Sequence, residues 1–113
     1  MLGSYVDKSN KSHMFLLSEG EFTTIDVPGA VQTGTMGISS GINPEGEIVG
    51  GYVGTDSRIH GFLLEENGFS TFSFPNSPLT NTRSINPRGD IVGFWREVPA
   101  SGGFKDHGFL LQR

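Results

Sequence analysis

Apolar residues recur at every second position over short stretches of this chain, and glycine, proline or asparagine bounds each stretch. In EIVGGYV (47–53), Ile48 and Tyr52 fall on one face of the predicted strand, and Phe72 and Phe74 share a face in the same way. A period of two is typical of a half-buried β-strand. Because no segment repeats its apolar residues with helical spacing, the pattern predicts an all-β chain of short strands.

The residues between the predicted strands match known β-turns. NPEG and NPRG, which begin at Asn43 and Asn86, place proline where its fixed φ suits a type I turn. The glycine that follows takes the left-handed position of a G1 bulge. The two asparagine side chains can bond the backbone two residues on. Asn67-Gly68 predicts a further tight hairpin.

One pentapeptide is repeated along the chain. HMFLL at 13–17 returns as HGFLL at 60–64 and again at 107–111, with a constant offset of 47 residues. A second block, GINPEGEIVGGY, returns as SINPRGDIVGFW with an offset of 43, so one unit carries four extra residues before its GIN. Units of about four strands and this length are typical of propeller blades. We therefore predict a single repeat domain over residues 1–113, with units at roughly 1–41, 42–84 and 85–113.

The repeated blocks resemble the bacterial extracellular HAF repeats. That family has a pattern similar to GIN..G.IVG.Y followed by HGFLL..G.FT..D.PGA. The present chain carries GINPEGEIVGGY, HGFLLEENGFS and HMFLLSEGEFTTIDVPGA, which together with the third unit extend over most of its length. The resemblance implies a propeller-like array of short four-stranded antiparallel units and an extracellular location, and it implies no reaction.

The chain holds about two and a half of these units, because LGSYV near its start matches VGGYV inside a later strand. A closed propeller needs roughly four to eight blades, and fewer than about three repeats do not bury their faces alone. We expect the blades to be completed by oligomerisation, with the chain as a homo-oligomer. Two alternatives are a piece of a longer protein and closure into a small barrel or sandwich.

Composition narrows the classes of function. The net charge is −4 and no lysine or arginine cluster occurs, which argues against nucleic acid as a partner. The chain has no cysteine, and it has no apolar run long enough to predict a membrane span. Its first residues lack the apolar segment of a signal peptide, so the compartment stays open.

Histidine occupies one repeat position three times, as His13, His60 and His107. We expect each ring to pack on its own blade and to bond a neighbouring backbone group. A metal-binding or catalytic role for one of them is the alternative. Tyr5, Tyr52 and Trp95 are likewise equivalent, and they suit packing between blades or, alternatively, a stacking platform for sugars or acyl chains.

GISSG (37–41) fits the G-x-S-x-G pattern of a nucleophilic serine, and it falls where one unit carries its extra residues. The helix that normally follows such a serine is not predicted here. A serine hydrolase would use Ser39 as nucleophile, His60 as base and Asp56 to orient the base.

Calcium is the other candidate for chemistry, although the sequence requires no cofactor. Asp7, Asp56 and Asp106 lie in short polar connections that could offer oxygen ligands to Ca²⁺. No EF-hand loop occurs, so solvated turns are the default interpretation.

The sequence thus favours a module that binds a small ligand or a protein partner at a channel or loop surface. A hydrolase of esters or lactones, serine-based or calcium-dependent and lactonase-like, is the alternative.

Overall fold

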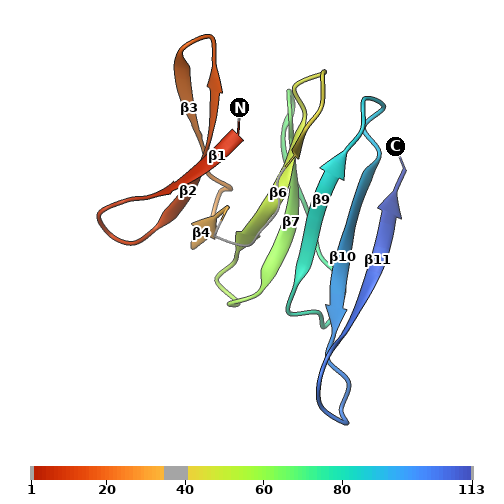
Figure 1. Cartoon of the computed structure of the whole chain (residues 1–113). Helices are drawn as coiled ribbons and strands as arrows, with labels where there is room; N and C mark the ends of the chain where they lie inside the picture. The colour runs from red at the N-terminus through yellow and green to blue at the C-terminus, as the bar shows by residue number, and fades with distance from the viewer. Residues whose placement is uncertain (1, 35–40, 113) are drawn as a thin grey trace.

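The computed structural model describes residues 2–34 and 41–112, whose strands form three antiparallel sheets standing side by side (Figure 1). The first sheet consists of β1 (Leu2–Val6), β2 (Ser12–Ser18) and β3 (Glu21–Ile25). The central sheet consists of β4 (Gln32–Thr33), β5 (Gly41–Ile42), β6 (Ile48–Val53), β7 (Ile59–Glu65) and β8 (Gly68–Phe72). The third sheet consists of β9 (Thr80–Ile85), β10 (Ile91–Glu97) and β11 (Lys105–Leu111). The described residues contain no helix, which confirms the all-β prediction, and so none that is long and apolar enough to cross a membrane.

Each sheet follows the chain order from strand to neighbouring strand. The central sheet runs β4-β6-β7-β8, and β5 also pairs with β6. Gln32 of β4 lies opposite Val53 at one end of β6, and Ile42 of β5 lies opposite Ile48 at the other end. Together β4 and β5 therefore flank β6 as the single strand β9 flanks β10. The extra residues found in the repeat fall between β4 and β5.

The turns after Asn43 and Asn86 have the predicted shape. Gly46 and Gly89 have φ angles of 83° and 92°, the left-handed region that glycine adopts without strain. Each asparagine Oδ1 accepts a hydrogen bond of 2.9 Å from a backbone N–H four residues on, rather than two. The hairpin between β7 and β8 also differs slightly from the prediction, because Glu65 lies opposite Gly68 and the turn is one residue earlier.

The core lies between the sheets, and the two-residue period of the strands decides which side chains enter it. One cluster joins the first and central sheets and contains Met14, Ile25, Val27, Ile48 and Phe62. A second joins the central and third sheets and contains Val49, Leu63, Ile85 and Ile91. Neighbouring residues of β6 and β7 therefore point into opposite clusters, and the central sheet is buried on both faces.

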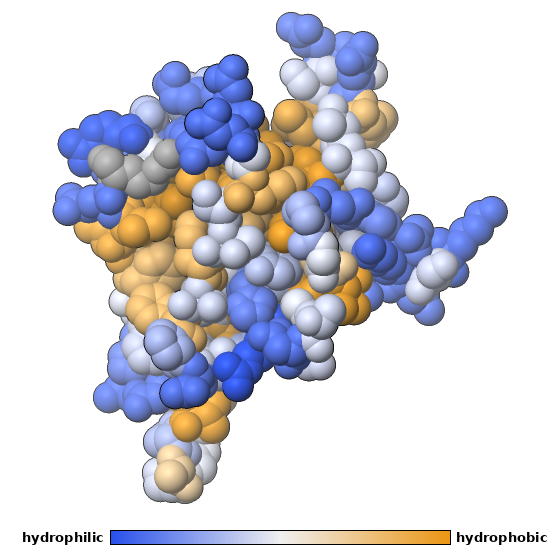
Figure 2. Space-filling view, turned by 180° about the vertical axis from the view of Figure 1, so that it is seen from behind, coloured by the Kyte–Doolittle hydropathy of each residue, from blue (hydrophilic) through white to orange (hydrophobic). Residues whose placement is uncertain are grey.

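In the central sheet, Tyr52 and Phe62 lie on the face that points toward the first sheet, and we call this the leading face. In the other two sheets, the leading face is the one that carries the residues equivalent to Tyr52 and Phe62. The opposite face of each sheet is its trailing face. The trailing face of the central sheet is covered by the third sheet, whereas the trailing face of the third sheet is open. Val49 is 0% exposed and its counterpart Val92 is 44% exposed. Leu63 is 4% exposed and its counterpart Leu110 is 59% exposed. Figure 2 shows apolar residues gathered on the left of the view, over the C-terminal sheet.

The leading face of the first sheet is open in the same way. Tyr5 and Phe22 are 42% and 69% exposed, whereas their counterparts Tyr52 and Phe69 are partly buried against the first core cluster. Phe15 lies between Tyr5 and Phe22, with its ring centroid 6.3 Å and 5.3 Å from theirs. The molecule thus has two open apolar faces, whose counterparts inside the chain are covered.

Candidate functional site

Each sheet carries the same pair of an aromatic ring and a histidine ring on one hairpin. The strand register places the two side chains directly opposite each other as Tyr5–His13, Tyr52–His60 and Trp95–His107. The ring centroids of these pairs are 5.0, 5.3 and 4.4 Å apart. The histidines therefore pack on their own sheets, as the sequence predicts.

The polar partner of each histidine differs from the prediction, because it is a carboxylate rather than a backbone group. Nε2 of the histidine lies 2.8 Å from Asp7 in the first sheet, 3.0 Å from Asp56 in the central sheet and 2.9 Å from Glu97 in the third. A carboxylate can accept the ring N–H in either charge state of the imidazole. The repeated unit is thus a triplet of aromatic ring, histidine and acid, which we call the aromatic–His–acid triplet.

The acids show how the repeat tolerates a change of sequence. Asp7 and Glu97 occupy the same repeat position, two residues after the aromatic ring. The central unit has Gly54 at that position, and Asp56 reaches back to the histidine from two residues further on. A Cβ on Gly54 would lie 2.9 Å from Oδ1 of Asp56 and 3.2 Å from Cδ2 of His60. Glycine therefore leaves room for the displaced carboxylate. Sequence reasoning paired only Asp56 with His60, as part of a serine hydrolase, and missed Asp7 and Glu97, although the acid two residues after the aromatic ring was a usable signal.

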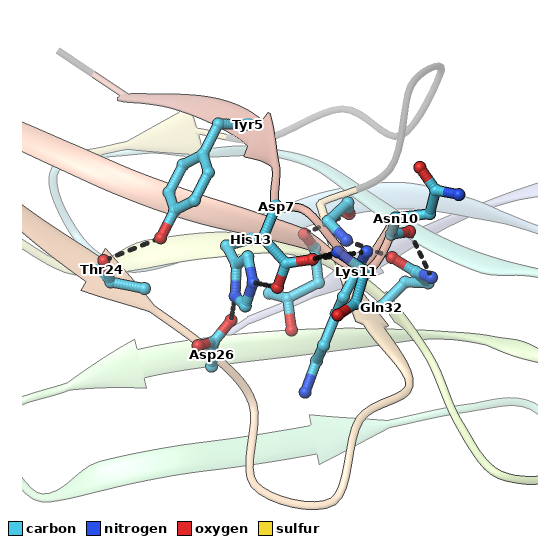
Figure 3. A network of polar contacts seen from close by, with 11 residues as sticks. Tyr5, Asp7, Asn10, Lys11, His13, Thr24, Asp26 and Gln32 are labelled. Atoms are coloured by element: carbon cyan, nitrogen blue, oxygen red, sulfur yellow. Dashed lines mark hydrogen bonds and ion pairs between the residues drawn. The ribbon is translucent and has the colours of Figure 1, made fainter.

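The first triplet has a second carboxylate (Figure 3). Nδ1 of His13 lies 2.6 Å from Asp26, and Nε2 lies 2.8 Å from Asp7, so both ring nitrogens are engaged. The hydrogen bond to Asp7 and then that to Asp26 raise the pKa of His13 above its usual value. The bond from His13, followed by that from the Lys11 backbone N–H, lowers the pKa of Asp7. This arrangement favours the protonated imidazolium between two acids, and it engages both ring nitrogens of His13.

Two of the three residues proposed for a serine hydrolase do meet. Nε2 of His60 lies 3.0 Å from Oδ2 of Asp56, and the backbone N–H of Arg58 followed by His60 lowers the pKa of Asp56. Beside this pair lies a cavity of about 240 Å³, which Pro28, Tyr52 and Thr55 also line. Ser39 lies outside the described residues. Because the first and third sheets repeat the contact between histidine and acid, that contact alone does not indicate catalysis.

The three aspartates considered as calcium ligands lie in hairpins of different sheets. Asp7 and Asp56 contact the histidines of their own hairpins, and Asp106 pairs with Arg96 at 2.9 Å, which lowers the pKa of Asp106. Within residues 2–34 and 41–112, no group of three or more histidine, cysteine, aspartate or glutamate side chains is arranged to hold a metal ion.

Asn43 does more than shape its turn. It is nearly buried, and its Nδ2 donates a hydrogen bond of 3.0 Å to the backbone oxygen of Asn86 in the next NPxG turn. Equivalent turns of consecutive units are thereby tied together along one edge of the molecule. This polar contact between units is therefore structural, like the apolar ones.

Two of the three equivalent aromatic residues, Tyr52 and Trp95, also have a structural role. Trp95 stacks on Phe74, with ring centroids 4.8 Å apart, and Tyr52 packs against the core cluster shared with the first sheet. These contacts confirm packing between sheets for two of the three equivalent aromatic residues. Tyr5, the third, lies on the open leading face.

A scan against protein-family models, a search of curated proteins and a search of solved structures each find no match to this chain.

Proposed function

We propose that this chain is a propeller-like repeat module, resembling the HAF repeats, whose function is to bind protein neighbours through its open sheet faces. In this view each sheet is a blade, the chain supplies about two and a half blades, and neighbours of the same architecture complete the array by oligomerisation. The partner is a protein rather than a small ligand, because the open surfaces are apolar sheet faces. No reaction is assigned to the module.

The observation that carries this proposal is the difference in exposure between matched residues. Val92 and Leu110 have the same side chains as Val49 and Leu63, yet the first pair is half exposed and the second is buried. A run of exposed apolar residues on one face indicates a binding surface. The sequence retains apolar residues at the open positions, as expected if another sheet covers them.

A groove on the third sheet supports the same conclusion. In the central sheet, Phe69 of β8 packs edge-on against Phe62, with ring centroids 5.8 Å apart. The counterpart of Phe62 in the third sheet is Phe109, and beside it lies an apolar groove of about 200 Å³ that Phe72 and Phe74 also line. A further outer strand of the same repeat would place its own phenylalanine in this groove.

The proposal is tested by supplying the next repeat covalently. A second copy of residues 65–111 is appended directly after Leu111, which continues the repeat in register. We expect the added strands to cover Val92 and Leu110 and to raise the free energy of unfolding by about 2 kcal/mol or more. Backbone amides of β11 should also become more protected in hydrogen exchange.

The matched control appends a flexible glycine–serine linker of equal length, which has no apolar face to offer. Protection of β11 with the repeat but not with the linker supports a module that stacks against like repeats. If the appended repeat leaves both stability and β11 exchange unchanged, the open faces do not bind repeats of this kind and the proposal fails.

The alternative function, hydrolysis of an ester or lactone, draws on the contact between His60 and Asp56 and on the adjacent cavity. It predicts turnover of p-nitrophenyl esters or simple lactones. In the serine version Ser39→Ala abolishes turnover and EDTA has no effect, whereas in the calcium version EDTA abolishes it. If the purified chain turns over neither p-nitrophenyl esters nor simple lactones, hydrolysis of these two substrate classes is excluded.

A further inference from the structure

We infer that the neighbour is a second copy of this chain, bound head to tail. The open trailing face of the third sheet, formed by Val92, Phe94 and Leu110, packs on the open leading face of the first sheet of the next copy, formed by Tyr5, Phe15 and Phe22. This inference rests on the proposed function and names its partner.

The two junctions inside the chain show that such faces fit each other. At the junction between the first and central sheets, the covered leading face presents Tyr52, Phe62 and Phe69. The leading face of the first sheet presents tyrosine and phenylalanine at the same three repeat positions, as Tyr5, Phe15 and Phe22. The leading face of the first sheet in a second copy therefore resembles the leading face of the central sheet. It can cover the third sheet as the central sheet covers the first.

The trailing side of the contact matches in the same way. The third sheet presents Val92 and Leu110 where the central sheet presents Val49 and Leu63, which the third sheet covers. Gly108, between the positions of His107 and Phe109 on β11, also lies on this side, and nothing is closer than 4.0 Å to a Cβ placed on it. Its counterpart Gly61 is tightly covered, with Thr82 Cγ2 2.8 Å from such a Cβ.

Charge favours the same pairing. On the trailing face, the guanidinium of Arg83 lies 5.6 Å from the centre of the Phe94 ring, and Arg83 is exposed. On the leading face, two carboxylates, Asp7 and Asp26, surround the single imidazole of His13. The two faces that are to meet therefore carry opposite charge at their polar margins, which favours contact between unlike faces over contact between like faces.

The predicted contact is heterologous, since it joins two different surfaces of the same chain. Each copy keeps one free trailing face and one free leading face, so assembly continues beyond a dimer or closes into a ring. A variant that blocks one face of each copy stops growth. Two variants blocked on opposite faces still share one intact contact, and they should form a dimer when mixed.

The experiment uses Leu110→Glu to block the trailing face and Phe22→Glu to block the leading face. Both side chains are mostly exposed, so each variant should keep its circular dichroism spectrum and its unfolding midpoint at low concentration. Val92→Glu replaces Leu110→Glu if the latter does not fold. Val98→Glu, at an exposed valine after β10 and outside both faces, is the matched control.

Molar mass is measured by light scattering after size exclusion, from about 5 to 500 μM, a range suited to a weak contact. We expect the wild type and Val98→Glu to exceed the 12.2 kDa of one chain as concentration rises. Each blocking variant should associate at least about 100-fold more weakly, because a buried unpaired carboxylate is costly. Their equimolar mixture should give a mass of two chains.

Three results overturn the inference. A wild-type chain that stays at the mass of one chain throughout shows that the partner is not a second copy, while stabilisation by the appended repeat can still uphold the proposed function. Loss of association in only one of the two blocking variants indicates contact between like faces. Association that survives both substitutions places the contact elsewhere, for example between the strand edges of β1 and β11.

Discussion

The replacement of Leu63 by alanine tests whether the sheets are stabilised by packing against each other. Leu63 is 4% exposed and lies in the cluster that joins the central and third sheets, with Ile85 and Ile91. Its counterpart Leu110 occupies the same position of β11 and is 59% exposed. The pair Leu63→Ala and Leu110→Ala removes the same atoms from the same repeat position, so the two variants differ only in what covers the side chain.

The expected magnitudes follow from burial. Full burial of a leucine side chain contributes about 1.5–3 kcal/mol, and the cavity left by truncation brings the usual loss to about 2–5 kcal/mol. We expect Leu63→Ala to lower the free energy of unfolding by about 3 kcal/mol, a large share of the roughly 5–15 kcal/mol typical of a domain. Leu110 already exposes more than half of its surface, so its truncation should cost about 1 kcal/mol or less.

Urea unfolding at about 1 μM chain measures both losses, since dilution suppresses association through the open faces. Trp95 is the single tryptophan and stacks on Phe74 and His107, so its fluorescence reports on the third sheet and its junction. With an m-value of about 1.5 kcal/mol per molar, Leu63→Ala should move the midpoint down by about 2 M and Leu110→Ala by well under 1 M. Equal shifts, or a larger shift for Leu110→Ala, would refute the reasoning that the third sheet covers the central one.

One further prediction uses the same matched design, and another concerns pH. Gly61→Ala should destabilise the fold, because the new Cβ would press on Thr82 and Phe72. Gly108→Ala, at the equivalent position, has no close neighbour and should change the melting temperature little. Similar melting temperatures for the two variants would contradict the packing between the central and third sheets. The second prediction concerns pH. The pKa of His13 is higher in the folded protein than in the unfolded chain, where it is about 6.5. Protonated His13 therefore stabilises the fold fully below about pH 6.5, and this stabilisation is lost as the pH rises through the folded-state pKa. The lowered pKa of Asp7 contributes stability above about 3.9, which is lost as pH falls through the folded value. The melting temperature of His13→Gln should therefore fall furthest below wild type near pH 5.5 and least near pH 9, and a gap independent of pH argues against the cation between two acids.

Much of the candidate site follows from repetition in the sequence, and the remainder does not. The equivalence of His13, His60 and His107 predicted three similar environments, and each ring does pack against an aromatic neighbour of its own hairpin. The contact between His60 and Asp56 was predicted only as part of a serine hydrolase, and Asp7 and Glu97 were not predicted as histidine partners. Asp56 is displaced by two residues from the position that Asp7 and Glu97 share, so the repeat alone did not reveal a common acid. Only the fold of each hairpin loop shows that both positions bring a carboxylate to the same ring nitrogen.

The sequence by itself determined the strands, their turns and the division into equivalent units, because a two-residue period and turn residues act over a few neighbouring positions. It also determined which face of each strand is apolar. The tertiary structure decided which of these equivalent faces are covered, since burial depends on whether a neighbouring sheet stands against them. Val49 and Val92 look alike in the sequence, yet one is sealed between sheets and the other meets water.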